Sequence, residues 1–302
     1  MYLKEQVRCA TDTENGPIIG SMGSAPAARS AAQRAVAHVA ARSSGGPVGP
    51  ELRVTLNIHP DRWFGGLLVL EAIGRDGVYR SQFETGTSNG GLTAYPGGAR
   101  WGWESRMFGG AYDHAPASDR PRYGSLNFRR FAVGGSPRFG SSHLRLRPET
   151  LARTTFCYPD SFMEPTSFGV ASAMSLIDLA EAAEPGDALD DYIEAQVHGP
   201  VCVDRDVQAV VLDPSFRGTR VQEAASRLGC AVEWHGGFTL GTAELARHPD
   251  YRGARYVRLG IEIAVDERLD PRIIGDAART GRHDGQDLKR VWHYVARFGS
   301  PG

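Results

Sequence analysis

Apolar and polar positions divide the chain into segments with two different periods. Alternation and β-branched residues predict strands at the following positions: 52–58, 78–83, 143–147, 192–201, 207–213, 230–234 and 255–265. Apolar residues spaced three and four apart predict helices at 25–43, 67–73, 168–184, 220–229 and near 284–299. Because strands and helices are mixed without an internal repeat, the sequence predicts an α+β fold.

Composition shifts along the chain predict three parts. Residues 1–50 form an N-terminal helical segment whose Gly/Pro-rich end is a linker. Residues 51–215 form the core, with a long insertion at about 92–185. Within this insertion, residues 94–148 are rich in Gly, Pro, Arg and aromatic residues and show little periodicity. Residues 216–302 form a C-terminal extension.

Charge and hydropathy exclude several classes of partner. The 302 residues carry a formal net charge of -1, which gives no electrostatic footprint for nucleic acid. No stretch approaches the roughly 18 apolar residues of a membrane span, and the first residues lack the apolar region of a signal peptide. We therefore expect neither nucleic-acid nor membrane binding, and either the bacterial cytoplasm or secretion by a non-classical route.

Metal chemistry has weak support in the sequence. The four cysteines form no CxxC pair, so no zinc knuckle is indicated. His283-Asp284 and Asp276, with His59 and Asp61 as further ligands, define a metal-dependent phosphoesterase as one alternative, although further His and Asp at ligand spacing are missing. We expect no metal.

A loop of hydroxyls, amide and glycine follows the predicted strand 78–83. Thr85, Thr87, Ser88 and Asn89 offer small donors and acceptors, and the glycines beside them let a backbone approach a bound group closely. The same residue types are also typical of an ordinary turn. The loop is therefore a candidate ligand-binding segment.

Polar side chains also stand on two predicted strands. The first strand leads into Asn57, His59, Asp61 and Arg62, and a late strand carries Glu194 and Gln196 on one face because strand side chains alternate. Alternatively, Asp61 and Arg62 form a solvated turn, and Glu194 lies on the exposed face of an edge strand.

The order of these segments resembles the ADP-ribosyltransferase superfamily, whose enzymes cleave NAD at the nicotinamide glycosidic bond. NIHPDR is similar to the first motif of that superfamily, FETGTSNG to the second and YIEAQVHGPV to the third. The chain further resembles, over roughly residues 50–300, a bacterial family that includes CteC-like enzymes. The segments that carry this resemblance are HPDR, SQFETGTSNGG, FGGAYD, RPRYGSLN, GGSPRFGSSH and IEAQVHGPV. CteC-like enzymes modify a threonine of ubiquitin.

The resemblance implies a split β-sandwich core with helical and loop insertions, NAD as the substrate and ubiquitin as the partner of a bacterial effector or toxin. It implies an aspartate-glutamate catalytic pair, with Glu194 as the glutamate and Asp61 as the aspartate, and Asp191 and Asp113 as alternatives. The residues implied to bind NAD are Asn57, His59, Arg62, Thr85, Thr87, Ser88, Asn89 and Gln196. The insertion or the C-terminal extension would recognise the acceptor.

Two features depart from the family patterns. Arginine-modifying members carry Glu-x-Glu, whereas this chain has Glu194-Ala195-Gln196, which disfavours arginine as the acceptor. The tyrosine of a second class is open among Tyr79, Tyr95 and Tyr123.

Two further functions share the same sequence features. A NAD glycohydrolase would use the same pocket but transfer the ribose to water. A non-catalytic binding module would keep the fold without turnover, although the retained Glu194 and the Thr/Ser loop argue against it.

Overall fold

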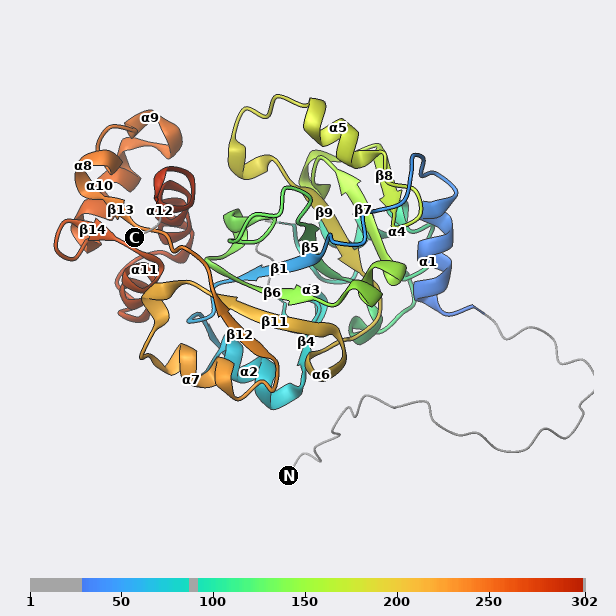
Figure 1. Cartoon of the computed structure of the whole chain (residues 1–302), viewed down its shortest axis with the longest axis horizontal. Coiled ribbons are helices and arrows are strands. Elements are labelled where there is room, and N and C mark those ends of the chain that lie inside the picture. Colours follow the sequence, from blue (N-terminus) through green and yellow to red (C-terminus); the bar gives the residue numbers. More distant parts are fainter. Residues whose placement is uncertain (1–28, 87–91, 301–302) are drawn as a thin grey trace, which may run out of the picture.

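The computed structural model describes residues 29–86 and 92–300, and its fold class is α+β, as predicted (Figure 1). Among the described residues, the main sheet has eight strands. In their order across the sheet they are β12 (Ala231–Trp234), β11 (Val207–Leu212), β6 (Ser142–Leu146), β1 (Val54–Ile58), β5 (Arg122–Leu126), β9 (Ile193–Val197), β7 (Thr154–Tyr158) and β8 (Ser167–Val170). Neighbouring strands are antiparallel except β11 and β12, which are parallel.

Helices and short strands surround this sheet. The α-helices are α1 (Ala31–Ala40), α2 (Val69–Asp76), α3 (Gln82–Thr85), α4 (Ala99–Met107), α5 (Leu176–Ala182), α6 (Val203–Asp206), α7 (Arg220–Ser226), α8 (Thr242–Leu245), α9 (Pro249–Arg252), α10 (Ala254–Ile263), α11 (Pro271–Arg279) and α12 (Gly285–Phe298). Short 3-10 helices are η1 (Ala117–Asp119), η2 (Pro137–Phe139), η3 (Pro148–Arg153), η4 (Ser161–Met163), η5 (Ala188–Asp190) and η6 (Pro214–Phe216). Two-residue strands are β2 (Trp63–Phe64), β3 (Leu67–Leu68), β4 (Val78–Tyr79), β10 (Val201–Cys202), β13 (Leu240–Gly241) and β14 (Arg268–Leu269).

The core has three parts. The largest packs the sheet against α2 and α7, and the side chains of Leu56 and Ile193 are fully buried in it. A second core joins α10, α11 and α12 around Trp292, and a third packs α1 and α4 around Trp103 and Phe108. Figure 1 shows α8 to α12 gathered at one end of the molecule, away from α1.

Central strands β1 and β9 are buried along their whole length. Both carry polar side chains inside, because β1 contains Asn57 and β9 contains Glu194. The register places Glu194 opposite Ser125 of β5 and Cys157 of β7. The edge-strand alternative for Glu194 is therefore wrong, since β9 has a neighbour on each side.

Three predicted elements differ from the structure. Most of the strand predicted at 255–265 lies in helix α10, which ends at Ile263, because Val257 and Gly260, three positions apart, face the helical core. The strand predicted at 78–83 ends at Tyr79, where Ser81 and Glu84 form a capping box that starts α3. The helix predicted at 168–184 begins only at Leu176, because the preceding residues form β8.

The range 92–185, predicted as an insertion, supplies strands β5 to β8 of the main sheet. It is therefore part of the central architecture rather than an appended module. In the C-terminal part, β12 also joins the main sheet. Within residues 29–86 and 92–300, no helix has the length and apolar character needed to cross a membrane.

Candidate active site

Glu194 is a buried carboxylate on the central strand β9, with only 6% of its surface exposed. Its Oε2 accepts hydrogen bonds from the Ser161 hydroxyl at 2.7 Å and the Ser161 backbone amide at 3.2 Å. Its Oε1 accepts one from Gln196 Nε2 at 3.0 Å. Burial raises the pKa of Glu194, and the positive charge of Arg100 is the largest opposing influence. The carboxylate is thus held in place by donors from its own strand β9 and from η4.

Arg100 of α4 is the cation nearest to this carboxylate among the described residues. Its side chain is buried, and its Nη1 donates to Ser161 Oγ at 2.6 Å and lies 3.9 Å from Glu194 Oε1. The guanidinium stacks over Tyr123, 4.1 Å from the ring centroid. Within the described part of the chain, Arg100 Nε has no hydrogen-bond partner. A buried donor is thus open beside Glu194.

A second buried acid lies behind Tyr123. The Tyr123 hydroxyl donates to Glu104 at 2.8 Å, and Arg120 donates to the other oxygen of Glu104 at 2.6 Å. Burial raises the pKa of Glu104 to about 7, although Arg120 opposes this shift. The residues Glu104, Tyr123, Arg100, Ser161 and Glu194 therefore form one continuous network.

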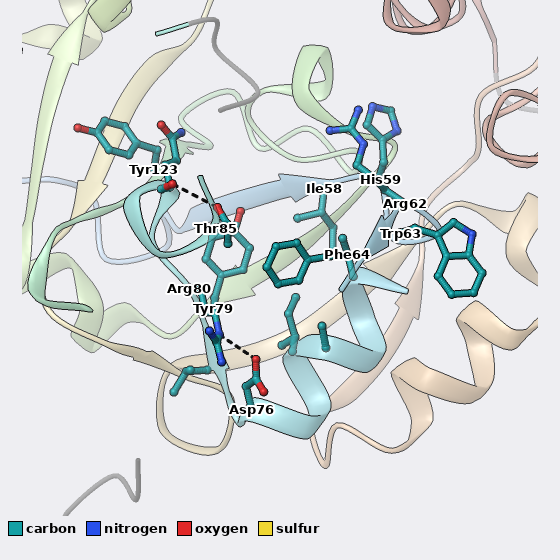
Figure 2. A pocket seen from close by; sticks show the side chains of 15 residues that line it. Ile58, His59, Arg62, Trp63, Phe64, Asp76, Tyr79, Arg80, Thr85 and Tyr123 are labelled. Atoms are coloured by element: carbon teal, nitrogen blue, oxygen red, sulfur yellow. Dashed lines mark hydrogen bonds and ion pairs between the residues drawn. The ribbon is translucent and has the colours of Figure 1, made fainter. Parts of the chain in front are cut away.

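Two cavities meet at this network. The smaller, of about 50 Å³, is lined by Glu194, Arg100 and Asn57 among others. The larger, of about 160 Å³, extends to the turn after β1 and is shown in Figure 2, where Phe64 and Tyr79 both point into it. Both cavities are lined by the same three residues: Tyr79, Gln82 and Tyr123. The residues that follow β1, such as His59 and Arg62, therefore line a cavity that adjoins the cavity of Glu194.

The predicted first-motif residues are divided between different surroundings. Asn57 donates to the backbone oxygens of Val133 and Gly140 at 3.0 and 3.2 Å, so it also holds the 133–140 loop. His59 and Arg62 line the larger cavity. Burial lowers the pKa of His59 to about 3, and Arg62 adds to this effect, so the imidazole is neutral at pH 7.

Of the four binding residues predicted in the second motif, only Thr85 lies in the described part of the chain. It ends α3, lines the larger cavity, and its hydroxyl donates to the Ser81 carbonyl oxygen at 3.2 Å. Thr87, Ser88 and Asn89 lie outside the described residues.

Gln196 bonds to Glu194 and lines neither of the two adjoining cavities. It is fully buried, its Oε1 accepts from Thr155 Oγ1 at 2.9 Å, and its Nε2 donates to Glu194. Its position favours a role in orienting the carboxylate, whereas the sequence suggests a contact to NAD.

Asp61 lines a third cavity, separate from the one that contains Glu194. Its Oδ2 lies 3.3 Å from Arg279 Nη1 of helix α11. Burial raises the pKa of Asp61 to about 6, although the Arg279 charge opposes the shift. The structure therefore does not bring Asp61 and Glu194 to the same cavity.

The alternative aspartates are also paired elsewhere. Asp191 lies 2.7 Å from Arg129, and Asp113 accepts from Ser105 at 3.1 Å. Of the three tyrosines, Tyr79 and Tyr123 line the cavities, whereas Tyr95 is 58% exposed.

Sequence reasoning missed three residues beside Glu194. All three, Arg100, Asp160 and Ser161, lie in the range 92–185 that the sequence predicts as an insertion. Asp160 accepts a hydrogen bond from Tyr192, and its charge contributes to raising the pKa of Glu194. The available signal was Asp160-Ser161 directly after the apolar strand at 154–158, where Asp160 caps η4.

The residues suggested as metal ligands have other roles. Asp284 caps α12 by accepting from the backbone amides of Gln286 and Asp287, and Asp276 pairs with Arg279. In the described ranges, no group of three or more His, Cys, Asp or Glu side chains is placed to hold a metal ion. Asp284 and Asp276 are thus engaged in a helix cap and an ion pair.

Comparison with known families places the chain in one of them. A family model described as "protein of unknown function (DUF3626)" matches residues 53–183 and 171–298, and the chain belongs to this family. No curated protein matches the chain.

Proposed function

We propose that this protein is a mono-ADP-ribosyltransferase, with an ADP-ribosyltransferase-like split β-sandwich core, that cleaves NAD and transfers ADP-ribose to a threonine hydroxyl of ubiquitin. The observation that carries the proposal is the buried Glu194 carboxylate on a central strand, facing a cavity that adjoins the one lined by His59, Arg62 and Thr85. Residues from all three motifs thus line adjoining cavities. The acceptor and delivery of the protein as a bacterial effector or toxin rest on the family resemblance.

Glu194 acts in this proposal on the nicotinamide ribose. The bond between ribose C1′ and the nicotinamide nitrogen breaks, and its electron pair leaves with neutral nicotinamide. The ribose then carries oxocarbenium-like charge, which a carboxylate bonded to a ribose hydroxyl stabilises. Ser161 and Gln196 keep that carboxylate oriented before the substrate arrives, so little reorganisation is needed.

His59 and Arg62 contact ribose or phosphate oxygens in the larger cavity. Arginine suits this role because its planar donors match paired acceptor oxygens. A neutral His59 provides one donor and one acceptor for a sugar hydroxyl.

The acceptor threonine needs a base when its oxygen bonds to C1′. Asp61 is the residue proposed to take the hydroxyl proton. It lines a cavity separate from that of Glu194, but this cavity shares His59 and Arg62 with the cavity of Figure 2, from which the acceptor would be reached. The raised pKa of Asp61, about 6, suits a group that exchanges protons near neutral pH. Asp160 is the alternative that the geometry adds, because its charge acts directly on Glu194.

Intact-protein mass spectrometry tests the proposal. Ubiquitin is incubated with NAD and the full chain, beside Glu194→Gln and a reaction without ubiquitin in which free nicotinamide is measured. We expect one ADP-ribose increment on ubiquitin, reduced about 100- to 1,000-fold in rate by the substitution.

Two other results would redirect the assignment. Nicotinamide release without an increment on ubiquitin would favour a NAD glycohydrolase or another acceptor. Absence of release in every reaction would overturn the NAD chemistry and favour a binding module.

A further inference from the structure

A continuous chain of hydrogen bonds connects Tyr112 to Glu194 inside the protein. The Tyr112 hydroxyl lies 2.8 Å from His198 Nδ1, and His198 Nε2 lies 3.0 Å from Thr155 Oγ1. Thr155 Oγ1 donates to Gln196 Oε1 at 2.9 Å, and Gln196 Nε2 donates to Glu194 Oε1 at 3.0 Å. All five residues are less than one-tenth exposed, and His198, Thr155 and Gln196 are fully buried. The hydrogen bonds are therefore shielded from water.

The strand register brings these side chains together. Glu194, Gln196 and His198 stand at alternate positions along β9 and just past its end, so their side chains lie on one face. Thr155 of the neighbouring strand β7 is directly opposite Gln196. Tyr112 follows α4, and its ring lies parallel to the His198 ring. The alternation that places Glu194 in its cavity thus also places the side chains that support it.

The order of donors and acceptors follows from the Thr155 hydroxyl, which has one proton to donate. Because that proton goes to Gln196 Oε1, Thr155 accepts from His198 Nε2. His198 Nδ1 in turn accepts from the Tyr112 hydroxyl, since burial lowers the pKa of His198 to about 3 and leaves the ring one proton. This order turns the Gln196 NH2 group toward Glu194, where it complements a charged carboxylate.

The reverse order would place one acceptor against another at Glu194. If the Gln196 amide turned by half a rotation, its oxygen would face the carboxylate, and only a protonated Glu194 could donate to it. Thr155 would then accept from Gln196, and His198 would carry its proton on Nδ1. The hydrogen bonds therefore couple the tautomer of His198 to the charge of Glu194.

We propose that Thr155 and His198 are positioning residues, which act through the Gln196 amide to keep Glu194 charged and oriented for its reaction. The inference rests on the proposed function, because its kinetic readout is the NAD cleavage proposed for Glu194. The other charged or titratable groups that act on Glu194 are Arg100, Asp160, Cys157, Tyr123 and Tyr192. These groups stay the same in every variant below, so a difference between variants is assigned to the hydrogen-bonded chain.

Nicotinamide release by the full chain, measured against pH, tests this role in Thr155→Val. The substitution removes the hydroxyl and leaves Gln196 free to turn its oxygen toward Glu194. Loss of the amide donor should raise the pKa of Glu194 further, because this hydrogen bond lowers it. We expect kcat to fall about 10-fold and the pH of half-maximal release to increase by about one unit, with little change in KM for NAD. Thr155→Ser keeps the hydroxyl and should restore both values.

Further variants separate positioning from stability. His198→Phe removes the donor to Thr155 and should shift the pH profile in the same direction. Gln196→Leu should shift it too, and Thr155→Val should add nothing to Gln196→Leu, because Thr155 acts through Gln196. Thr154→Val is the matched control, since Thr154 is also fully buried on β7 but donates to the Thr150 carbonyl oxygen, at 2.7 Å. It should leave kcat and the pH profile unchanged, and thermal unfolding verifies that each variant is folded.

A folded Thr155→Val with the kcat and pH profile of the wild-type chain would overturn the inference, and so would an equal loss in Thr154→Val. If the wild-type chain releases no nicotinamide, the proposed function fails, and the titration of Glu194 itself decides the inference. Carbon-13 NMR of protein labelled at the glutamate carboxyl groups measures this titration, with Glu194→Gln assigning the signal. A higher pKa of Glu194 in Thr155→Val than in the wild-type chain supports the positioning role, and equal pKa values overturn it.

Discussion

Single side chains at the candidate site show how the fold keeps charge inside. Burial favours the neutral form of Glu194, but Arg100 and the donors Ser161 and Gln196 favour the carboxylate. Such opposed influences are typical of functional sites, although structural ion-pair networks also produce them. The distinction between these two roles has to come from activity measured on single substitutions.

The two aspartates proposed as bases give different patterns of activity. If Asp61 accepts the threonine proton, Asp61→Asn should lower ADP-ribose transfer by about 100-fold or more but leave hydrolysis of NAD by water largely unchanged. Asp160→Asn should then leave the ratio of transfer to hydrolysis as it is. Nicotinamide release and labelled acceptor are measured in parallel, with exposed Asp178→Asn as the control. A selective loss in Asp160→Asn alone would assign the base to Asp160.

The buried Asp61 also predicts a pH dependence of stability. The pKa of Asp61 is about 6 in the folded chain, against 3.8 for an unburied aspartate. Between these two pH values the folded state therefore retains a proton that the unfolded state releases. Stability from this group is therefore lost as the pH rises from about 4 to 6. The change amounts to about 3 kcal/mol, at 1.36 kcal/mol per pKa unit.

Urea unfolding at pH 4.5 and pH 7 checks this sign. Relative to the wild-type chain, Asp61→Asn should gain stability as the pH rises, because the substituted amide does not titrate. Parallel pH profiles for the two proteins would show that Asp61 has no raised pKa.

The residues of the site were predictable only where they lie on periodic elements. Asn57 and Glu194 follow from strand alternation, and both line the smaller cavity. Arg100 and Ser161 do not, because their positions depend on how α4 and η4 fold back onto β9. A local pattern carries no information about such distant contacts.

At the scale of elements, the same limit explains the predictions that failed. Strands β1 and β11 were predictable from their apolar, β-branched residues. Residues 255–265 have similar composition, but those up to Ile263 lie in α10, where a Cβ at Gly260 would come within 2.6 Å of Leu245. Tertiary packing between helices thus overrides the local preference for a strand.

Glycines in two helices provide a test of packing against propensity. In α11, a Cβ at Gly275 would overlap the Asp61 carboxylate, whereas in α4 the nearest atom to a Cβ at Gly102 is Arg106 Nη1 at 3.6 Å. Alanine is favoured over glycine by up to about 1 kcal/mol in a helix interior. Gly102→Ala should therefore stabilise the chain by about 0.5–1 kcal/mol, and Gly275→Ala should destabilise it by about 1–3 kcal/mol.

Chemical denaturation of the two variants decides which effect governs α11. Equal stabilisation by both substitutions would mean that α11 is not packed tightly on Asp61. The cavity lined by Asp61 and Gly275 would then have a different shape.

At the scale of the whole molecule, the C-terminal helices contact the sheet through a few polar residues. Trp292 of α12 donates to the Pro137 carbonyl oxygen at 3.0 Å, and Arg279 of α11 reaches Asp61. Asp187, in the segment before β9, accepts from Tyr251 at 2.7 Å and Arg252 at 2.5 Å. The segment leading to Glu194 is thus tied to the helical core.

Asp187 should therefore stabilise the helical core as well as its own loop. Asp187→Ala removes a partly buried acceptor and leaves Arg252 and Tyr251 without that partner, which should cost about 1–3 kcal/mol. Hydrogen exchange followed by mass spectrometry should show faster exchange in α9 and α12, while central strands β1 and β5 remain protected. Asp178→Ala, exposed on α5, is the matched control and should change neither. Unchanged exchange in the Asp187 variant would mean that apolar contacts alone hold the helices on the sheet, because the polar connection would then contribute no measurable stability.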